Sequence, residues 1–109
     1  MFVANHEIKK EPAGQGATRK ILGRGGNLMM VEVTFAKDAV GALHAHPHEQ
    51  VSYIGHGSFE FNLGGKKQIL RRGDSVYVAS GLTHGVIARE ENAIIVDVFS
   101  PQREDFLKK

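Results

Sequence analysis

The feature that most constrains the fold is a series of short runs in which apolar and polar residues alternate, separated by glycine-rich turns. The clearest run is 58–63, where phenylalanine or leucine occupies every second position, as in a strand with one face on a core. Gly64-Gly65 follows, and because glycine tolerates positive φ, this pair predicts a two-residue hairpin turn into a partner strand at 66–70.

Similar runs predict further strands, and no long amphipathic helical pattern separates them. The additional strands are expected at 27–35, 50–54, 75–79, 84–89 and 93–99. Many short strands joined by tight turns predict an all-β fold, an antiparallel sandwich or barrel whose natural form is a jelly-roll β-barrel. With 109 residues the chain can bury one core, so we expect a single domain.

The two ends of the chain are expected to lie outside this barrel. Residues 1–20 contain a polar segment with proline and glycines and are interpreted as an N-terminal arm or edge strand that could pack on another subunit. Residues 21–109 then form the barrel and a short C-terminal tail, in which 102–109 makes one or two helical turns after Pro101 ends the sheet.

Composition excludes several classes of function. Lys plus Arg number 14 against 12 Asp plus Glu, a net charge of +2, which is too small an excess to predict a nucleic-acid or membrane partner. No stretch approaches the roughly 20 apolar residues needed to cross a bilayer. The absence of cysteine leaves histidine and oxygen donors as the possible metal ligands. We therefore expect a soluble, unprocessed, cytoplasmic protein.

Histidines cluster in the segment His44-Ala45-His46-Pro47-His48-Glu49-Gln50, which holds three of the six in the chain. A first-row divalent metal needs donors that converge from separate segments, and His84 is the best distant candidate. His44 and His46, two apart on one strand, would point to the same interior side. His48 follows Pro47, where this alternation no longer applies, and is left out of the ligand set. The alternative is a fortuitous surface tract.

These segments resemble the two sequence motifs of the cupins, small β-barrel metalloproteins. The first motif is a glycine, five residues, HxH, three or four residues, Glu, six residues and Gly, and residues 38–57 keep this spacing. The second is Gly, five residues, PxG, two residues and His, and residues 73–84 keep it. The resemblance implies one divalent transition metal, Ni, Zn, Mn or Fe. The ligands that it implies are His44, His46, Gln50 and His84.

Three positions depart from these motifs. Asp38 replaces the opening glycine but tolerates positive φ, and Ala79 replaces a proline, which affects turn stiffness. Gln50 replaces glutamate: its amide oxygen can bind a metal but leaves the ion's double charge uncompensated. One unit of charge about 4 Å from a substrate carboxylate is worth on the order of 4 kcal/mol at an effective dielectric near 20, which favours an acidic ligand. Alternatively, Gln50 is a wall residue that binds no metal.

The C-terminal segment 97–106, DVFSPQREDF, is similar to the DxFSPxRxDF ending of the single-domain cupins of pectin and alginate degradation, which open the ring of 4,5-unsaturated monouronates.

Asp97 interrupts an otherwise apolar strand, where a carboxylate is costly unless it is paired or functional. It is therefore the candidate general acid/base, and the alternative is an outward-facing side chain. Arg103 offers a planar fork to a substrate carboxylate, or it forms a surface salt bridge with Glu104 or Asp105. Phe99 is a candidate wall of the sugar pocket or plain core.

Together these features predict a homodimeric, metal-dependent cupin enzyme that converts 4,5-unsaturated monouronates to linear keto uronates without redox chemistry. Two alternatives stay open because one scaffold hosts many reactions. One is a cupin dioxygenase or isomerase acting on another small acid, which oxygen consumption would reveal. The other is a non-catalytic cupin that binds an acidic sugar and leaves the ultraviolet absorbance of its enol ether unchanged.

Overall fold

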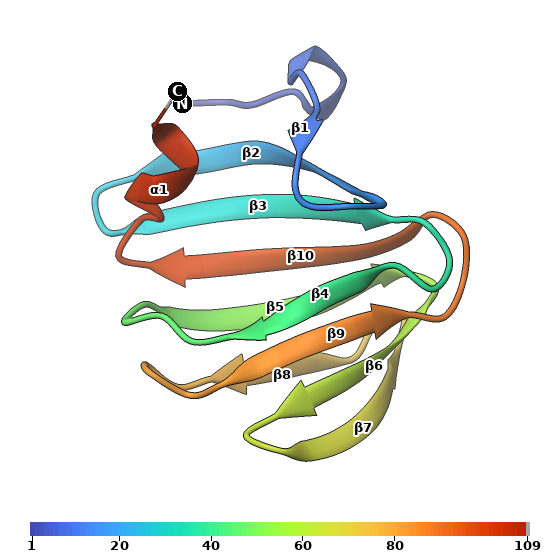
Figure 1. The fold of residues 1–109 in the computed structure, drawn as a ribbon. Helices are drawn as coiled ribbons and strands as arrows, with labels where there is room; N and C mark the ends of the chain where they lie inside the picture. Colours follow the sequence, from blue (N-terminus) through green and yellow to red (C-terminus); the bar gives the residue numbers. More distant parts are fainter. Residues whose placement is uncertain (109) are drawn as a thin grey trace.

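A computed structural model describes residues 1–108 as two antiparallel sheets that face each other (Figure 1). The larger sheet has the strand order β1-β2-β3-β10-β5-β8 and the smaller one β4-β9-β6-β7. The strands are β1 (Glu11–Pro12), β2 (Ala17–Gly25), β3 (Leu28–Phe35), β4 (Val40–His44), β5 (Glu49–His56), β6 (Ser58–Leu63), β7 (Lys66–Arg71), β8 (Ser75–Val78), β9 (His84–Ala88) and β10 (Ala93–Ser100), and the short helices are η1 (Asn5–Glu7) and α1 (Glu104–Leu107). The predicted all-β jelly-roll is confirmed.

Alternation along the strands fixes which side chains face the interior. In β5, Gln50, Ser52 and Ile54 are buried and the residues between them are exposed or only partly buried. The antiparallel pairing of β5 with β10 places Ser52 opposite Asp97 and Gln50 opposite Phe99. Because directly paired residues lie on the same face of a sheet, these polar side chains lie on the inner face of the larger sheet. Asp97 therefore faces inward, and the alternative of an outward-facing Asp97 is wrong.

Two apolar clusters fill the space between the sheets. The larger includes Phe35 and Phe59, whose rings meet edge to face with their centres 5.3 Å apart. The smaller contains Met29, Val31 and Phe99 and is covered by apolar side chains of α1. The C-terminal tail is thus packed against the barrel, and α1 lies beside β2 and β3 (Figure 1).

The turns show where the sequence predicts local structure well. Gly64 and Gly65 join β6 to β7 with φ values of 58° and 91°, and Asp38 has φ of 68° in the turn before β4, as predicted. The tail forms one helical turn rather than two. Within residues 1–108, no helix is long and apolar enough to span a bilayer.

One local prediction is wrong. His46 was expected on the same strand as His44, but β4 ends at His44 and His46 lies in the loop that follows. The boundary between arm and barrel that was expected at residue 20 falls inside β2.

Candidate metal centre and ligand cavity

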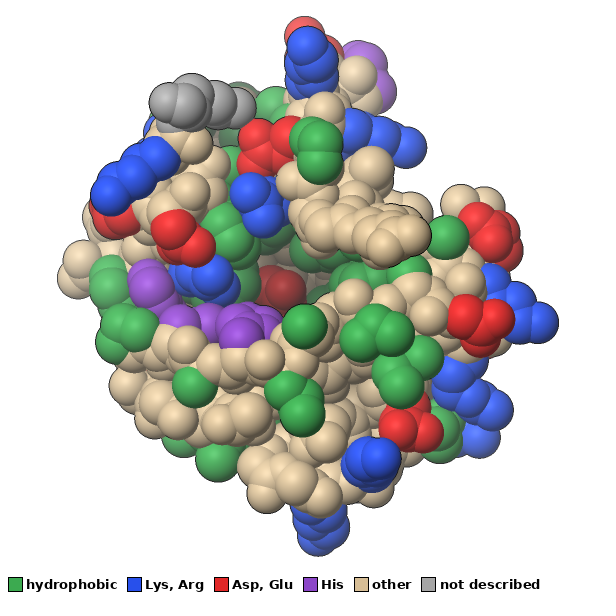
Figure 2. All heavy atoms as spheres, in the orientation of Figure 1, with side chains coloured by type: hydrophobic (Ala, Val, Ile, Leu, Met, Phe, Trp, Pro, Cys, Tyr) green, Lys and Arg blue, Asp and Glu red, His purple; other side chains and the backbone are tan. Residues whose placement is uncertain are grey.

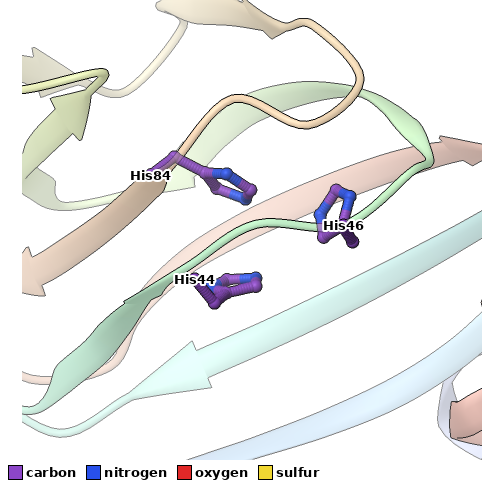
Figure 3. A group of neighbouring side chains, drawn as sticks. All are labelled: His44, His46 and His84. Atoms are coloured by element: carbon purple, nitrogen blue, oxygen red, sulfur yellow. The ribbon is translucent and has the colours of Figure 1, made fainter.

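Three histidines from three places in the chain converge between the sheets (Figure 3). His44 ends β4, His46 lies in the next loop, and His84 begins β9. One ring nitrogen from each lies within 4.8 Å of the others, and the ring centres are 4.4 to 5.4 Å apart. One ion with bonds of about 2.0–2.1 Å would hold two nitrogens at most about 4.2 Å apart, so the rings need to move inward by only a few tenths of an ångström to share it.

Each of these rings is oriented by a backbone carbonyl. Nδ1 of His44 lies 2.9 Å from the oxygen of Ala42, and Nδ1 of His84 lies 2.9 Å from that of Leu82. Nδ1 of His46 lies 3.1 Å from the oxygen of His48. A carbonyl only accepts, so each Nδ1 carries the hydrogen and each Nε2 presents its lone pair. Metal-binding histidines are commonly oriented in this way.

Burial keeps two of these rings in the neutral form that binds metals. His46 is 9% exposed and His84 3% exposed, and burial is the main cause that lowers the pKa of both below the usual 6.5. The positive charge of Arg103 lowers both further. The buried Nε2 of His84 has no hydrogen-bond partner among the described residues, so its lone pair is available.

Gln50 lies beside the three histidines and is the predicted fourth donor. Its amide nitrogen donates to the hydroxyl of Ser52 at 2.8 Å and lies 3.3 Å from Oδ1 of Asp97, which directs Oε1 toward Nε2 of His46, 3.0 Å away. With Nδ1 of His46 donating to a carbonyl, these two facing atoms both carry lone pairs. A shared cation satisfies both. The four side chains His44, His46, Gln50 and His84 therefore fit a divalent metal.

An irregularity in the pairing of β4 with β9 brings two of the histidines side by side. Gly41 pairs with Val86, but after a shift of one residue His44 pairs with His84. This bulge changes which residues of β4 face inward. Gly85 allows the close approach, since a Cβ there would lie 2.8 Å from the carbonyl oxygen of Gly41. The convergence of the histidines thus depends on a residue without a side chain.

Asp97 lies behind Gln50 in the same polar group. The hydroxyl of Ser52 donates to its Oδ1 at 2.6 Å. Burial raises the pKa of Asp97 to about 6, against the opposing effects of Ser52, Arg103 and Gln50. A carboxyl with this pKa exists in both protonation states near neutral pH, which is the property that a group exchanging protons with a ligand needs.

Arg103 lies at the start of α1 and is held on three sides. Its Nε and Nη2 donate to the two carboxylate oxygens of Asp105 at 3.1 and 2.9 Å, and its guanidinium carbon lies 5.0 and 4.2 Å from the ring centres of Phe99 and Phe106. The expected salt bridge with Asp105 is present, but the Arg103 side chain is only 11% exposed and lines the cavity. The salt bridge therefore leaves Arg103 in the cavity wall, and its role in binding a substrate carboxylate stays a prediction.

A cavity of about 490 Å³ joins these groups. Figure 2 shows it as a hollow with histidines along one side and basic and apolar side chains along the opposite rim. The predicted site residues that line it are His44, Gln50, His84, Asp97, Phe99 and Arg103. Its size is within the range of small-molecule sites.

His46 and His48 lie beside the cavity lining. His46 is held against Gln50, while His48, which was excluded from the ligand set, packs its ring 5.3 Å from that of His46 and supplies the carbonyl that orients it. His48 is outside the group of three histidines whose ligand atoms converge.

Three further cavity residues, Ser52, Phe106 and Arg19, had no predicted role. Ser52 could have been found, because it lies two residues after Gln50 on the same strand and so shares its face. Phe106 lies in the same C-terminal segment as Arg103 but was given no role. Arg19 lies in β2 and also lines the cavity; no local pattern distinguishes it from the exposed basic residues.

Comparisons with known proteins give a consistent result. The cupin domain family matches residues 31–99. The chain is 42% identical over 107 residues to the pectin degradation protein KdgF of Dickeya dadantii, covering 97% of each. The solved structure of KdgF from Halomonas sp. is similar, with a TM-score of 0.94, 37% identity and 97% of each chain covered. An RmlC-like cupin from Shewanella frigidimarina has a TM-score of 0.91 at 40% identity, covering 96% of this chain and 94% of that one.

Proposed function

This chain belongs to the cupin family, and from that membership we propose that it is an enzyme of uronate breakdown, which converts 4,5-unsaturated monouronates from pectin or alginate to linear keto uronates. The observation that carries the proposal is the group formed by three oriented histidines, Gln50 and the buried carboxyl of Asp97 along one cavity. Near-complete coverage of the KdgF proteins supports the choice of substrate.

His44, His46, His84 and the amide oxygen of Gln50 would hold one divalent ion, Ni, Zn, Mn or Fe. When bound, such an ion supplies Lewis acidity and a fixed point that orients the oxygens of the sugar. The donor set is neutral, since three imidazoles and an amide carry no charge. A uronate carboxylate is therefore attracted to the site rather than repelled by a ligand of the same sign.

Arg103 binds the substrate carboxylate, and Phe99 forms part of the wall on which the sugar lies. Asp105 already holds Nε and Nη2 of Arg103, so the guanidinium plane is fixed before substrate arrives and less entropy is lost on binding. Phe99 is 2% exposed and lines the cavity, so it serves both the core and the site.

Asp97 moves the proton. As a carboxylate it accepts the hydrogen of the hemiacetal hydroxyl at C1 while the bond from C1 to the ring oxygen breaks, which leaves an aldehyde at C1 and an enolate whose oxygen is on C5. As a carboxylic acid it then returns the same proton to C4 as the enolate becomes the C5 ketone. The reaction is an isomerisation in which one proton moves from oxygen to carbon, and no electrons are lost or gained.

The test is turnover of purified 4,5-unsaturated galacturonate, followed by loss of the enol-ether absorbance, with and without a chelator. We expect turnover by the metal-loaded protein and a large loss after chelation. Asp97→Asn should lower kcat by 100-fold or more, since general acid–base groups contribute about 10²–10⁴-fold, whereas Asp74→Asn, in a turn outside the cavity, serves as the control. Saturable binding without turnover would instead identify a sugar-binding protein.

The proposal includes a homodimer in the cytoplasm. The outer face of the larger sheet carries a row of directly paired apolar residues, Met30, Val98, Val51 and Tyr77. Met30, Val51 and Tyr77 are 40%, 46% and 54% exposed. A contiguous apolar face of this kind is typical of a contact surface, and a second copy of the chain would cover it.

A further inference from the structure

Arg19 is a second arginine of the cavity. It lies in β2, opposite Glu11 of β1 and Val33 of β3. Paired residues share a face of the sheet, and Val33 also lines the cavity. The Arg19 side chain is only 21% exposed, so its charge lies in the cavity wall rather than in bulk solvent.

The hydrogen bonds of Arg19 are incomplete. Its Nε donates to Oε1 of Glu11 at 2.8 Å, and within residues 1–108 neither Nη1 nor Nη2 donates to a protein acceptor. Arg103 uses Nε and Nη2 on Asp105, and its Nη1 likewise donates to no acceptor in that range. Largely buried guanidinium groups usually have their donors satisfied. Both arginines therefore offer hydrogen-bond donors to a ligand in the cavity.

Both guanidinium groups lie against the ring of Phe106. Their central carbons lie 3.9 Å (Arg19) and 4.2 Å (Arg103) from its centre, so they are at most about 8 Å apart. One carboxylate can bridge guanidinium groups at this separation. Each of its two oxygens would accept a hydrogen bond of about 2.9 Å from a different arginine. The electron-rich faces of the ring stabilise both cations next to it.

Both arginines line the same cavity as His44 and His84. Figure 2 shows basic side chains on the rim of this hollow, one of them directly beside the histidines. A small sugar acid can therefore place its hydroxyl and ring oxygens toward His44 and His84 and its carboxylate toward the arginines.

We propose that Arg19 and Arg103, both held against the ring of Phe106, together form the carboxylate-binding site of the cavity, and that Arg19 is a specificity-determining residue for uronic acids over neutral sugars. The ligand class rests on the proposed function. The paired-arginine site itself rests on the geometry of Arg19, Phe106 and Arg103.

The test uses the metal-loaded protein with D-galacturonate as the binding probe, titrated by calorimetry or NMR, and 4,5-unsaturated galacturonate as the substrate. Arg19→Gln removes the charge and the fork, and Arg19→Lys keeps the charge alone. Arg24→Gln is the matched control, because Arg24 lies on the same strand but is exposed, bonds Gln102 at 3.1 Å and does not line the cavity. Zinc affinity and the midpoint of thermal unfolding are measured for each variant.

Arg19→Gln should weaken D-galacturonate binding and raise KM by roughly 10- to 100-fold, the loss expected for charge-assisted hydrogen bonds. Its kcat should stay within about threefold of the wild type, with Arg19→Lys intermediate and Arg24→Gln within about twofold. Zinc affinity should not change. Equal D-galacturonate affinity for Arg19→Gln and Arg24→Gln would overturn the proposal. A loss of D-galacturonate affinity in Arg19→Gln that is accompanied by lower zinc affinity and a lower midpoint of thermal unfolding would also overturn it, because Arg19 would then have a purely structural role.

The two levels of the proposal fail differently. If the wild type binds D-galacturonate through Arg19 but does not consume unsaturated uronates, the proposed reaction is wrong and the carboxylate site stands. If it consumes them and Arg19→Gln has the KM of the wild type, the reaction stands and the role of Arg19 is wrong.

Discussion

Replacing Gly85 by alanine should weaken metal binding even though Gly85 offers no ligand. A Cβ at this position would lie 2.8 Å from the carbonyl oxygen of Gly41 and 3.1 Å from the backbone nitrogen of Leu43. Both atoms belong to the backbone of β4, which cannot give way as a flexible side chain can. β4 must therefore move away from β9.

The size of this movement sets the size of the effect. Ordinary contact begins at 3.4 Å and the Cβ would lie 2.8 Å from the carbonyl oxygen, so relief requires a displacement of about 0.6 Å. His44 is on β4 and His84 is directly opposite on β9, so their separation changes with the strands, whereas metal–ligand distances tolerate only about 0.2 Å. We expect metal affinity to fall roughly 10- to 100-fold, as for loss of an orienting contact, and the metal-free protein to lose about 1–3 kcal/mol of stability through overpacking.

The assay is calorimetric titration of chelator-treated protein with Zn²⁺, with urea unfolding of the metal-free form alongside. Gly23→Ala is the control, because a Cβ at Gly23 in β2 would meet nothing within 4 Å. The reasoning is refuted if Gly85→Ala folds and binds Zn²⁺ as tightly as Gly23→Ala does.

Three further predictions concern charge and the outer surface. Metal-free Asp97→Asn should be more stable than the wild type at pH 8 and equal to it near pH 4. A pKa raised from 3.8 to about 6 corresponds to at most about 3 kcal/mol of folding stability, and because the side chain keeps some exposure in the cavity we expect the wild type to lose roughly 1–2 kcal/mol as pH rises through 6. Urea unfolding at several pH values measures this loss, and the same difference between the two proteins at pH 4 and pH 8 would contradict the predicted sign. Gln50→Glu should tighten Zn²⁺ binding and raise KM for the uronate roughly tenfold, because the new charge offsets that of the ion; calorimetry and steady-state kinetics measure both, and an unchanged KM would show that the neutral ligand is irrelevant to substrate choice. If the proposed dimer uses the outer sheet face, Val51→Lys should give monomers in analytical ultracentrifugation without loss of the fold, whereas a dimer that persists in this variant would place the interface elsewhere.

The sequence by itself determined the strands, the tight turns and the family. Alternation has a period of two and is set by the local backbone, so 58–63 and its hairpin at Gly64 and Gly65 could be read directly. The spacing of the histidine motifs identified His44, His46 and His84 as partners because turns of fixed length place them, although the strand that was expected to carry His46 ends two residues earlier. The roles of Gln50, Asp97, Phe99 and Arg103 remain predictions.

Only the tertiary structure decided which distant side chains share the cavity. The inward direction of Asp97 follows from its pairing with Ser52, which an apolar run on both sides of the residue could not reveal. The bulge that sets His44 opposite His84, and the placement of Arg19 against Phe106, depend on register and packing between segments that are 40 and 87 residues apart in the chain. Such contacts arise from the closure of the barrel, and a local pattern carries no information about them.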